Sequence, residues 1–473
     1  MKASSKHKSF SGFLYSFFKL NENNTNIKTE LIAGITTYIT MAYALLVIPN
    51  ILKFSGMNAS GIIGDGAENL NLLNDPIIAS AFTATCLASA FGTLVMALYA
   101  NLPFALAPAI GLAAFFTYSV CMTLGYSWRQ GLAAVFISGI LFILITVTSI
   151  RQKIIECLPH NIKLAITAGI GLFITLIGLK SGGIVVADPG SLLAFGKLTD
   201  PGTVLTIIGT IIIGILIAKK VKGAMLIGII VTTLIGIPLK VTNISNINLI
   251  SAPPSMVPTL MAFDFKGLLN HNGTGILGAI FSIVMVVLTF SMVDLFDTIG
   301  TLIGTAKKAN MLQADGTIKN MNKALLADAV ATTAGAVFGV TTTSTYIESN
   351  SGITEGGRTG LTSVITGILL ALSVFFVGIV GIVPAQATAP VMIVMGALML
   401  ESVKEIDFSD FTEALPAFFT IAIMPFSYSI ANGIAVGIIF YPVMKLACGK
   451  HKEVHPIMYI LAALFIVRYI LLP

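Results

Sequence analysis

The sequence predicts an all-α polytopic membrane protein, and composition and hydropathy are the observations behind this prediction. Only 10% of the 473 residues are charged, 56% are hydrophobic, and the mean hydropathy is +0.93. Soluble domains carry about 25% charged residues, and so few charges would leave large apolar patches facing water. We therefore expect most of the surface to face lipid.

Apolar runs long enough to cross a bilayer recur along the chain. A hydrocarbon core about 30 Å thick needs about 20 apolar residues per helix, whereas transmembrane β-strands alternate in blocks of about ten residues. The continuous runs occupy residues 31–51, 77–100, 131–150, 162–179, 204–218, 223–239, 276–303, 324–340, 361–382, 390–400, 411–426, 431–446 and 457–472. The connections are too short for a separate soluble domain, so we expect one membrane domain.

The basic residues gather in alternate connections, although the formal net charge is only +6. Lys and Arg are frequent before residue 30 and recur in 219–222 and 445–452, whereas 56–75 contains neither. This distribution is typical of the positive-inside rule and predicts a cytoplasmic N-terminus. Because the positive charge follows the membrane topology, it does not indicate nucleic acid as a partner.

Two segments do not have the sequence of an ordinary membrane helix. Residues 101–122 (NLPFALAPAIGLAAFFTYSVCM) contain two prolines, and residues 340–360 (VTTTSTYIESNSGITEGGRTG) begin with β-branched residues. Both patterns favour a short extended stretch leading into a half-helix. Interrupted segments at matching positions of two halves indicate the binding site of a carrier. The first interrupted segment lies two spans after the run 31–51, and the second lies two spans after the run 276–303. This matching position predicts two inverted halves of about seven segments each.

Asp294 and Asp297 lie inside an apolar run, where ionisable residues are costly and usually functional. Their spacing of three places both carboxylates on roughly one helix face. They could point into a cavity, one accepting N–H groups from a substrate and the other holding a proton. Alternatively, one of them caps a nearby loop or pairs with a lysine.

Several other polar residues leave two interpretations open. Glu348 begins the second half-helix and could accept a hydrogen bond from a substrate or act as an N-cap. Asp328 could be a core hydrogen-bond partner or a functional carboxylate. We expect most of the hydroxyls of 341–345 to bond the local backbone, and Glu355 and Arg358 to form a structural salt bridge.

The chain contains no motif of a nucleotide-driven pump, a metalloprotease or a serine hydrolase. The four cysteines, Cys86, Cys121, Cys157 and Cys448, are widely spaced and form no metal motif. We therefore expect no metal, no cofactor and no enzymatic activity. Secondary transport remains, with a passive channel as an alternative.

Four segments resemble the AzgA-like guanine/hypoxanthine/adenine branch of the purine permeases in the nucleobase–cation symporter family. They are TELIAGITTYITMAYALLVIPNIL, DLFDTIGTLIGTAKKANML, TYIESNSGITEGGRTGLTSVITGILL and SYSIANGIAVGIIFY. The resemblance runs over nearly all of residues 29–446, and the run EGGRTGLT is highly specific.

This resemblance implies a uracil-transporter-like fold of fourteen segments, arranged as a 7+7 inverted repeat with core and gate domains. Segments 3 and 10 would carry the short extended pieces, with the substrate beside them. The implied divisions are a cytoplasmic tail (1–28), core halves of segments 1–4 (29–150) and 8–11 (273–383), gate halves of segments 5–7 (151–272) and 12–14 (384–447), and a C-terminal tail with a possible interfacial helix (448–473).

The resemblance also implies a set of site residues. Asp294 and Glu348 match the substrate-binding carboxylates of the family, and Asp297 matches a residue important for transport; all three are candidates for proton coupling. Ala113 stands where relatives carry a substrate-binding asparagine, since APGMGLNAYF in the family is APAIGLAAFF here. An alanine cannot hydrogen-bond a purine edge, which leaves the choice of purine open.

Phe115 and Thr345 complete the expected substrate-binding set. An aromatic ring such as Phe115 could stack on a planar ligand, although it could equally belong to an apolar core. The expected function is import of hypoxanthine, guanine or adenine across the cell membrane by proton symport, with an elevator or rocking motion. Sodium coupling, another planar solute such as uracil, xanthine or urate, and a homodimer are left open.

Overall fold

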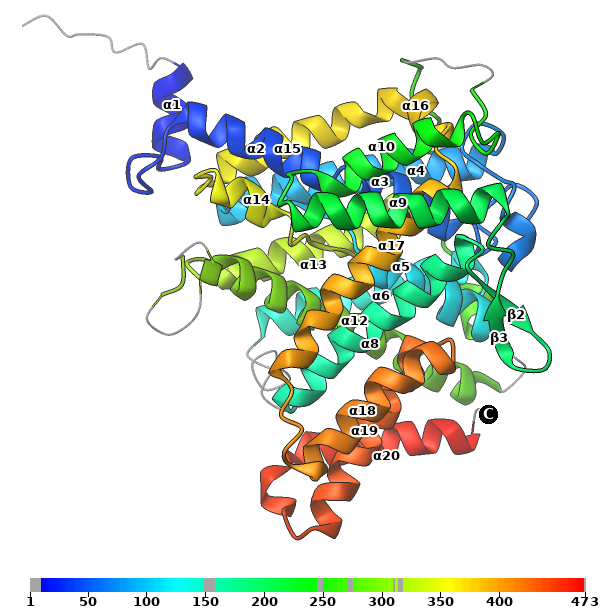
Figure 1. The fold of residues 1–473 in the computed structure, drawn as a ribbon. Coiled ribbons are helices and arrows are strands. Elements are labelled where there is room, and N and C mark those ends of the chain that lie inside the picture. Colours follow the sequence, from blue (N-terminus) through cyan, green and yellow to red (C-terminus); the bar gives the residue numbers. More distant parts are fainter. Residues whose placement is uncertain are drawn as a thin grey trace, which may run out of the picture.

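The computed structural model describes residues 10–148, 158–244, 250–270, 275–308, 311–313 and 318–471, and Cys157 lies outside them. The described chain is mostly helical (Figure 1). Its α-helices are α1 (Phe10–Phe17), α2 (Ile27–Met41), α3 (Ala44–Leu52), α4 (Pro76–Val95), α5 (Ile110–Ala114), α6 (Trp128–Val147), α8 (His160–Ser181), α9 (Pro201–Ala218), α10 (Ala224–Gly236), α11 (Phe265–Leu269), α12 (Gly275–Lys308), α13 (Met321–Phe338), α14 (Ser349–Thr354), α15 (Gly360–Leu372), α16 (Val377–Gly381), α17 (Ala385–Met399), α18 (Phe411–Phe426), α19 (Ile430–Ala447) and α20 (Pro456–Leu471).

Short elements of other kinds complete the fold. The 3-10 helices are η1 (Gly64–Ala67), η5 (Ser373–Phe376), η6 (Leu400–Glu405) and η7 (His451–Glu453), and the π-helices are η2 (Met96–Ala100) and η3 (Phe115–Thr123). The strands are β1 (Leu106–Pro108), β2 (Val185–Asp188), β3 (Leu192–Phe195) and β4 (Thr343–Thr345).

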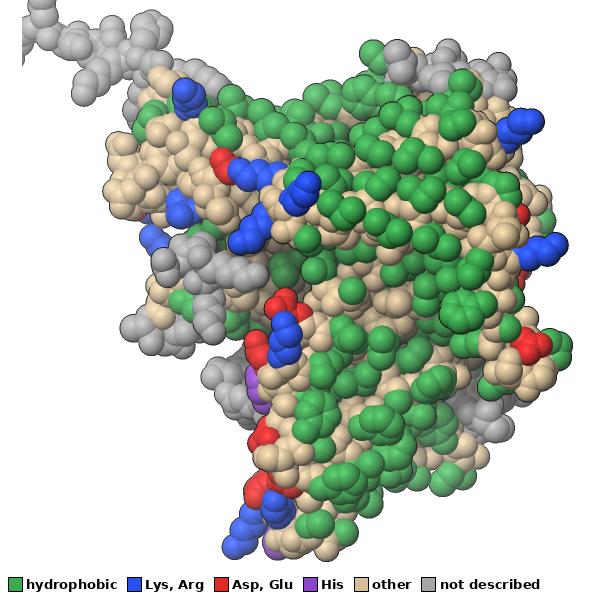
Figure 2. Space-filling model, viewed as in Figure 1, with side chains coloured by type: hydrophobic (Ala, Val, Ile, Leu, Met, Phe, Trp, Pro, Cys, Tyr) green, Lys and Arg blue, Asp and Glu red, His purple; other side chains and the backbone are tan. Residues whose placement is uncertain are grey.

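The predicted polytopic membrane architecture is confirmed. Among the described residues, nine helical segments are long and apolar enough to cross a membrane. Figure 2 shows a face over α8, α9 and α17 covered by hydrophobic side chains, with most charged side chains toward its margins. Side chains such as Ile211 of α9 and Leu234 of α10 are more than half exposed, as expected for residues that contact lipid.

Polar capping residues determine where several of these helices begin. Asp75 and Asp200 each precede a proline and accept hydrogen bonds from the first-turn backbone of α4 and α9. Proline suits the first helical position because its missing N–H would be unpaired there. Ser127 and Gln130 form a capping box at the start of α6.

The helices form two groups by their contacts. In the first helix group, α13 packs on α4 and α6, α15 packs on α2 and α4, and α12, α14, α3 and α5 join the same cluster. In the second helix group, α8 packs on α17 and α18, α9 packs on α10 and α17, and α19 packs on α18. The two groups meet where α2, α3 and α5 contact α10, α17 and α8 respectively.

A hairpin of β2 and β3, which was not among the predicted elements, lies between α8 and α9. These strands pair antiparallel with Val185 opposite Phe195 and Asp188 opposite Leu192. Asp188 accepts hydrogen bonds from the Ser191 backbone and hydroxyl, which closes the turn. The two strands are only four residues each, too short to be distinguished from a connection by hydropathy.

The prediction of a salt bridge between Glu355 and Arg358 is wrong. Glu355 instead pairs with Lys222, which follows α9 in the second helix group. Arg358 donates from its guanidinium to the carbonyl oxygens of Ile353 and Gly357. The Arg358 side chain is thus bonded to backbone acceptors within the turn. Glu355 is therefore available to Lys222, which lies 133 residues away in the sequence.

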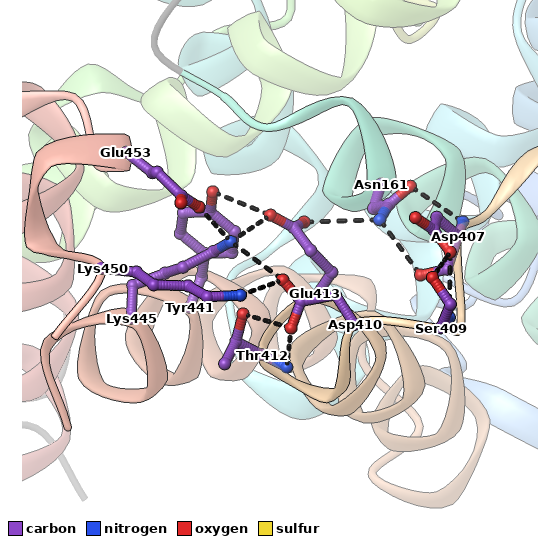
Figure 3. A network of polar contacts seen from close by, with 10 residues as sticks. All are labelled: Asn161, Asp407, Ser409, Asp410, Thr412, Glu413, Tyr441, Lys445, Lys450 and Glu453. Atoms are coloured by element: carbon purple, nitrogen blue, oxygen red, sulfur yellow. Dashed lines mark hydrogen bonds and ion pairs between the residues drawn. The ribbon is translucent and has the colours of Figure 1, made fainter. Parts of the chain in front are cut away.

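A polar network at one end of the second helix group surrounds a buried lysine (Figure 3). The ammonium of Lys445 lies 2.8 Å from Glu413 and 2.7 Å from Glu453, and its side chain is only 2% exposed. Lys450 lies 2.7 Å from Asp410 and, by this hydrogen bond, holds the pKa of that carboxyl well below its usual range. The network therefore connects α18, α19 and η7.

Helix α20 is the segment that the sequence indicated as a possible interfacial helix. Glu453, just before α20, pairs with Lys445 near the end of α19. The Tyr469 hydroxyl, near the other end of α20, donates to Asn432 in the first turn of α19 at 2.8 Å. The two helices therefore run antiparallel along one another.

Lys445→Met is expected to lower the stability of the purified protein by about 2 kcal/mol, the usual scale for hydrogen bonds to charged groups. The substitution leaves three clustered carboxylates without their shared cation. Thermal unfolding in detergent measures the effect, with Lys404→Met as the matched control because the Lys404 side chain is 77% exposed. Equal melting temperatures for the two variants would contradict the role of the network.

The contribution of Asp410 should also depend on pH. Its pKa is lowered in the folded protein, so its stabilising effect is fully present above the pKa of an unfolded aspartate, about 3.9, and is lost progressively as the pH falls from there through the lowered pKa of the folded carboxyl. Asp410→Asn should therefore reduce the melting temperature more at pH 7 than near pH 3.

Candidate functional site

The two interrupted segments meet as a short antiparallel ladder. Both contain a strand, as predicted, and β1 pairs with β4 so that Leu106 lies opposite Thr345 and Pro108 opposite Thr343. The ladder continues at both ends, because the Ala109 N–H donates to the Thr342 carbonyl and the Tyr346 N–H donates to the Ala105 carbonyl. Backbone at membrane depth must be paired within the protein, so this ladder allows two half-helices, α5 and α14, to begin inside the fold.

Gly339 makes the change from helix to strand possible. It ends α13 with a φ of 98°, in the left-handed region that favours glycine. A Cβ at this position would clash with Thr259. The chain can therefore leave α13 and turn directly into β4, which places β4 beside the helix that it follows.

Asp294 and Asp297 lie within α12, facing β4 and α13. The Thr332 hydroxyl donates to Asp294 Oδ2 at 3.0 Å, while Asp294 Oδ1 has no partner among the described residues. Ser344 approaches Asp297 Oδ2 at 3.4 Å. The alternatives of a loop cap or a lysine partner do not apply here, since α12 is continuous and no ion pair of the described residues includes either carboxylate.

Asp328 is the third carboxylate of this cluster and is fully buried. It accepts a hydrogen bond from Thr298 at 2.8 Å and another from Thr345 at 3.0 Å. Thr345, expected to contact substrate, is only 2% exposed and directs its hydroxyl to Asp328. In this structure Asp328 therefore holds α12, α13 and β4 together.

The hydroxyls before Thr345 do not bond the local backbone as expected. Those of Thr341, Thr342 and Thr343 are buried and have no hydrogen-bond partner among the described residues. The expectation was wrong because the nearby backbone is already paired: the Thr342 carbonyl accepts from Ala109, and the Thr343 carbonyl accepts from the Thr332 hydroxyl. Three donors are consequently left over near the ladder.

Glu348 follows β4 and lies where the two helix groups meet. The Tyr43 hydroxyl, from the first helix group, donates to Glu348 Oε1. The same hydroxyl lies 3.6 Å from the sulfur of Met395, which belongs to α17 in the second helix group. Glu348 makes no side-chain capping bond to α14, so the N-cap alternative does not describe this structure. Its side chain is partly exposed and close enough to Asp297 for their charges to interact.

Ala113 and Phe115 are fully buried beside the ladder. Ala113 lies one turn after Ala109, and its N–H donates to the Ala109 carbonyl at 2.8 Å. The Phe115 ring packs edge-on against Phe290, with the ring centroids 4.7 Å apart, one turn before Asp294 in α12. Both residues thus lie near the carboxylates, and their contact with a substrate stays a prediction.

The pairing that orders the carboxylates was not among the predictions. Asp294 and Thr298 are four apart on α12, and Asp328 and Thr332 are four apart on α13. The structure pairs them crosswise, Thr332 with Asp294 and Thr298 with Asp328. The repeated D-x-x-x-T spacing was a usable signal, because residues four apart lie on one helix face.

The arrangement concentrates negative charge without a cationic partner. Among the described residues, no Lys or Arg pairs with Asp294, Asp297, Asp328 or Glu348, and no His/Cys/Asp/Glu group forms a metal site. Burying unpaired charge is costly, and such groups tend to take up a proton instead. The site can therefore exchange protons and accept hydrogen bonds from a neutral donor.

Asp328→Leu is expected to destabilise the protein by about 2 kcal/mol, because it leaves two buried hydroxyls without an acceptor. Asp328→Asn should remain close to the parent chain, since its amide oxygen can still accept one hydrogen bond. Thermal unfolding of both variants in detergent measures the difference. If the leucine variant is as stable as the asparagine variant, Asp328 does not hold the three elements together.

Comparison with known proteins identifies relatives over almost the whole chain. The family model Xan_ur_permease, described as Permease family, matches residues 28–436. The adenine permease AdeP of Escherichia coli (strain K12) is 40% identical over 97% of this chain and 96% of that protein. The guanine/hypoxanthine permease PbuG of Bacillus subtilis (strain 168) is also 40% identical, over 97% of this chain and 99% of that protein.

A solved structure shares the fold. The transmembrane domain of the cyanobacterial bicarbonate transporter BicA aligns with a TM-score of 0.58, covering 89% of this chain and 96% of that domain. Sequence identity in this alignment is only 15%, so the likeness concerns the arrangement of the helices and not the transported solute.

Proposed function

This chain belongs to the Permease family, as the resemblance predicted, and from that premise we propose that it carries purine nucleobases across the cell membrane by secondary active transport. AdeP, named for adenine, and PbuG, named for guanine/hypoxanthine, are both 40% identical to it. We therefore propose a purine base as the substrate and leave open which purine is preferred.

The observation that best supports this function is the position of Glu348. It is a partly exposed carboxylate, held by the Tyr43 hydroxyl, at the place where the two helix groups meet. A neutral purine presents ring N–H groups in its plane, and a fixed carboxylate is a suitable acceptor for them. Asp294 Oδ1, which has no partner among the described residues, offers a second acceptor nearby.

The negative charge of the carboxylates supports coupling to a proton. A proton binds one carboxylate of the Asp294, Asp297 and Glu348 set, and the neutral base then docks against the others. Protonation removes one negative charge, which lowers the cost at which the loaded site passes the low-dielectric barrier. Coupling requires in addition that reorientation is favoured only when proton and base are both bound or both absent.

For the movement itself, we assign the first helix group to the core domain and the second to the gate domain. The ladder of β1 and β4, with the carboxylates beside it, belongs to the core. Met395 of α17 and the helices around it provide the facing surface of the gate. An elevator or rocking motion between the two would expose Glu348 to each side in turn, with the N-terminus in the cytoplasm.

Anion transport is the rival function, since the bicarbonate transporter BicA has the same fold. The carboxylate cluster argues against it. Like charges at short range repel each other by several kcal/mol in a low-dielectric site, and no described lysine or arginine offsets the four carboxylates. A neutral, donor-rich heterocycle fits this site better than an anion.

Glu348→Gln is expected to reduce the uptake of labelled adenine, guanine or hypoxanthine more than tenfold in cells deficient in purine transport. Tyr43→Phe should raise KM about tenfold, because one hydrogen bond to a charged group contributes about 1.5 kcal/mol. Glu405→Gln is the matched control at an exposed position. Absence of uptake of all three bases by the parent chain, with the protein shown to reach the membrane, would refute purine transport.

Proton coupling is tested separately in proteoliposomes. An inward proton gradient without sodium should drive accumulation of the base, and Asp297→Asn should weaken this accumulation more than it weakens exchange of internal for external base. Accumulation that requires a sodium gradient and ignores the proton gradient would instead identify sodium as the coupling ion.

A further inference from the structure

A cavity lined partly with aromatic rings lies away from Asp294, Asp297 and Glu348. It has a volume of about 240 Å³, and its lining includes Asp65, Tyr118, Lys180, Val186 and Tyr428. Asp65 belongs to η1 and Tyr118 to η3, beside the first helix group, whereas the other three belong to or adjoin the second group. The cavity thus lies between the two groups, at the end where α8 meets the β2–β3 hairpin.

Two of the lining rings, Tyr118 and Tyr428, belong to a closed aromatic cluster with Phe173. Tyr118, Phe173 and Tyr428 pack edge to face in all three pairings, with ring centroids 5.6 to 6.3 Å apart. Tyr118 comes from η3, while Phe173 comes from α8 and Tyr428 from the turn between α18 and α19. A movement that parts the two helix groups at this end would therefore separate Tyr118 from the other two rings.

The cluster is joined to the region of the carboxylates by one helix. Tyr118 is five residues after Ala113 along the continuous helix of α5 and η3, a rise of roughly 7 Å. Between them, Phe115 packs against Phe290, one turn before Asp294. A solute that leaves the cavity past Tyr118 would move along this helix toward the carboxylates.

The lining of the cavity also includes an ion pair and a tyrosine hydroxyl. The ammonium of Lys180 lies 3.1 Å from Asp65 and 5.6 Å from the centre of the Tyr428 ring. The Asp65 side chain is 74% exposed, and an exposed ion pair opens easily because water competes for it. The Tyr428 hydroxyl is buried and has no partner among the described residues, which leaves it available to a docked solute.

We propose that this cavity is an outer subsite, where a planar, uncharged nitrogen heterocycle docks before the aromatic cluster opens. Its rings would stack on Tyr118 and Tyr428, and Asp65 and Lys180 would supply an acceptor and a donor for its edge. The volume is slightly below the usual lower limit for ligand pockets, about 300 Å³, and suits a solute of one or two fused rings. This inference rests on the proposed transport of purines and adds a second binding place to it.

The test measures protection of a reporter cysteine in intact cells. Val186→Cys lines the cavity, and Leu192→Cys lies on the same hairpin outside the lining, with Leu192 82% exposed. Both should react with a membrane-impermeant maleimide, because the hairpin is expected on the outside. Saturating base should slow the reaction of Val186→Cys at least threefold and leave Leu192→Cys unchanged.

Two further variants decide whether the protection comes from the outer subsite. Adding Glu348→Gln to Val186→Cys should preserve the protection, because the outer subsite binds independently of the central carboxylate. Adding Tyr428→Leu should abolish it, and Tyr428→Phe should retain most of it by keeping the ring. Loss of protection with Glu348→Gln, or unchanged protection with Tyr428→Leu, would overturn the outer subsite.

The failure of this inference can be distinguished from the failure of the proposed function. If the parent chain takes up a purine base but Val186→Cys is never protected by it, the outer subsite is refuted and purine transport stands. If the parent chain takes up none of the three bases and none protects the reporter, both proposals fail together.

Discussion

The pairing of β1 with β4 is the constraint on which the rest of the structure depends. Membrane-depth backbone cannot be left unpaired, so two half-helices can start in the middle of the fold only if the stretches before them satisfy one another. The ladder does this for Leu106–Pro108 and Thr343–Thr345. Because the backbone is paired there, the adjoining side chains of the second segment are available for other purposes, and Glu348 lies three residues beyond the strand.

The carboxylates are ordered by hydroxyls and not by cations. Thr298 and Thr332 exchange partners between α12 and α13, so that each helix stabilises the aspartate of the other. Neutral donors hold the carboxylates in position without fixing their charge, whereas a lysine partner would keep them ionised. The site therefore stays able to gain and lose a proton, and the stably charged network around Lys445 lies elsewhere, within the second helix group.

Much of the fold was predictable because lipid imposes simple rules on composition, length and backbone pairing. The two interrupted segments and the three carboxylates could be identified from prolines, β-branched residues and intramembrane charge. The partners of these groups could not, because they depend on contacts between distant elements. Thr345 bonds Asp328 and not a substrate in this structure, Tyr43 holds Glu348 across 305 residues, and Glu355 pairs with Lys222. The hairpin of β2 and β3 escaped notice because its strands are short.

The measurement that tests the account most directly is calorimetric titration of the purified protein with adenine, guanine and hypoxanthine in two buffers of different ionisation enthalpy. The difference between the buffers gives the number of protons taken up with the base. We expect saturable binding of at least one base with the uptake of about one proton near neutral pH, as expected for a buried carboxylate that binds a proton together with its ligand. Binding without proton uptake, or no binding of any of the three, would contradict it.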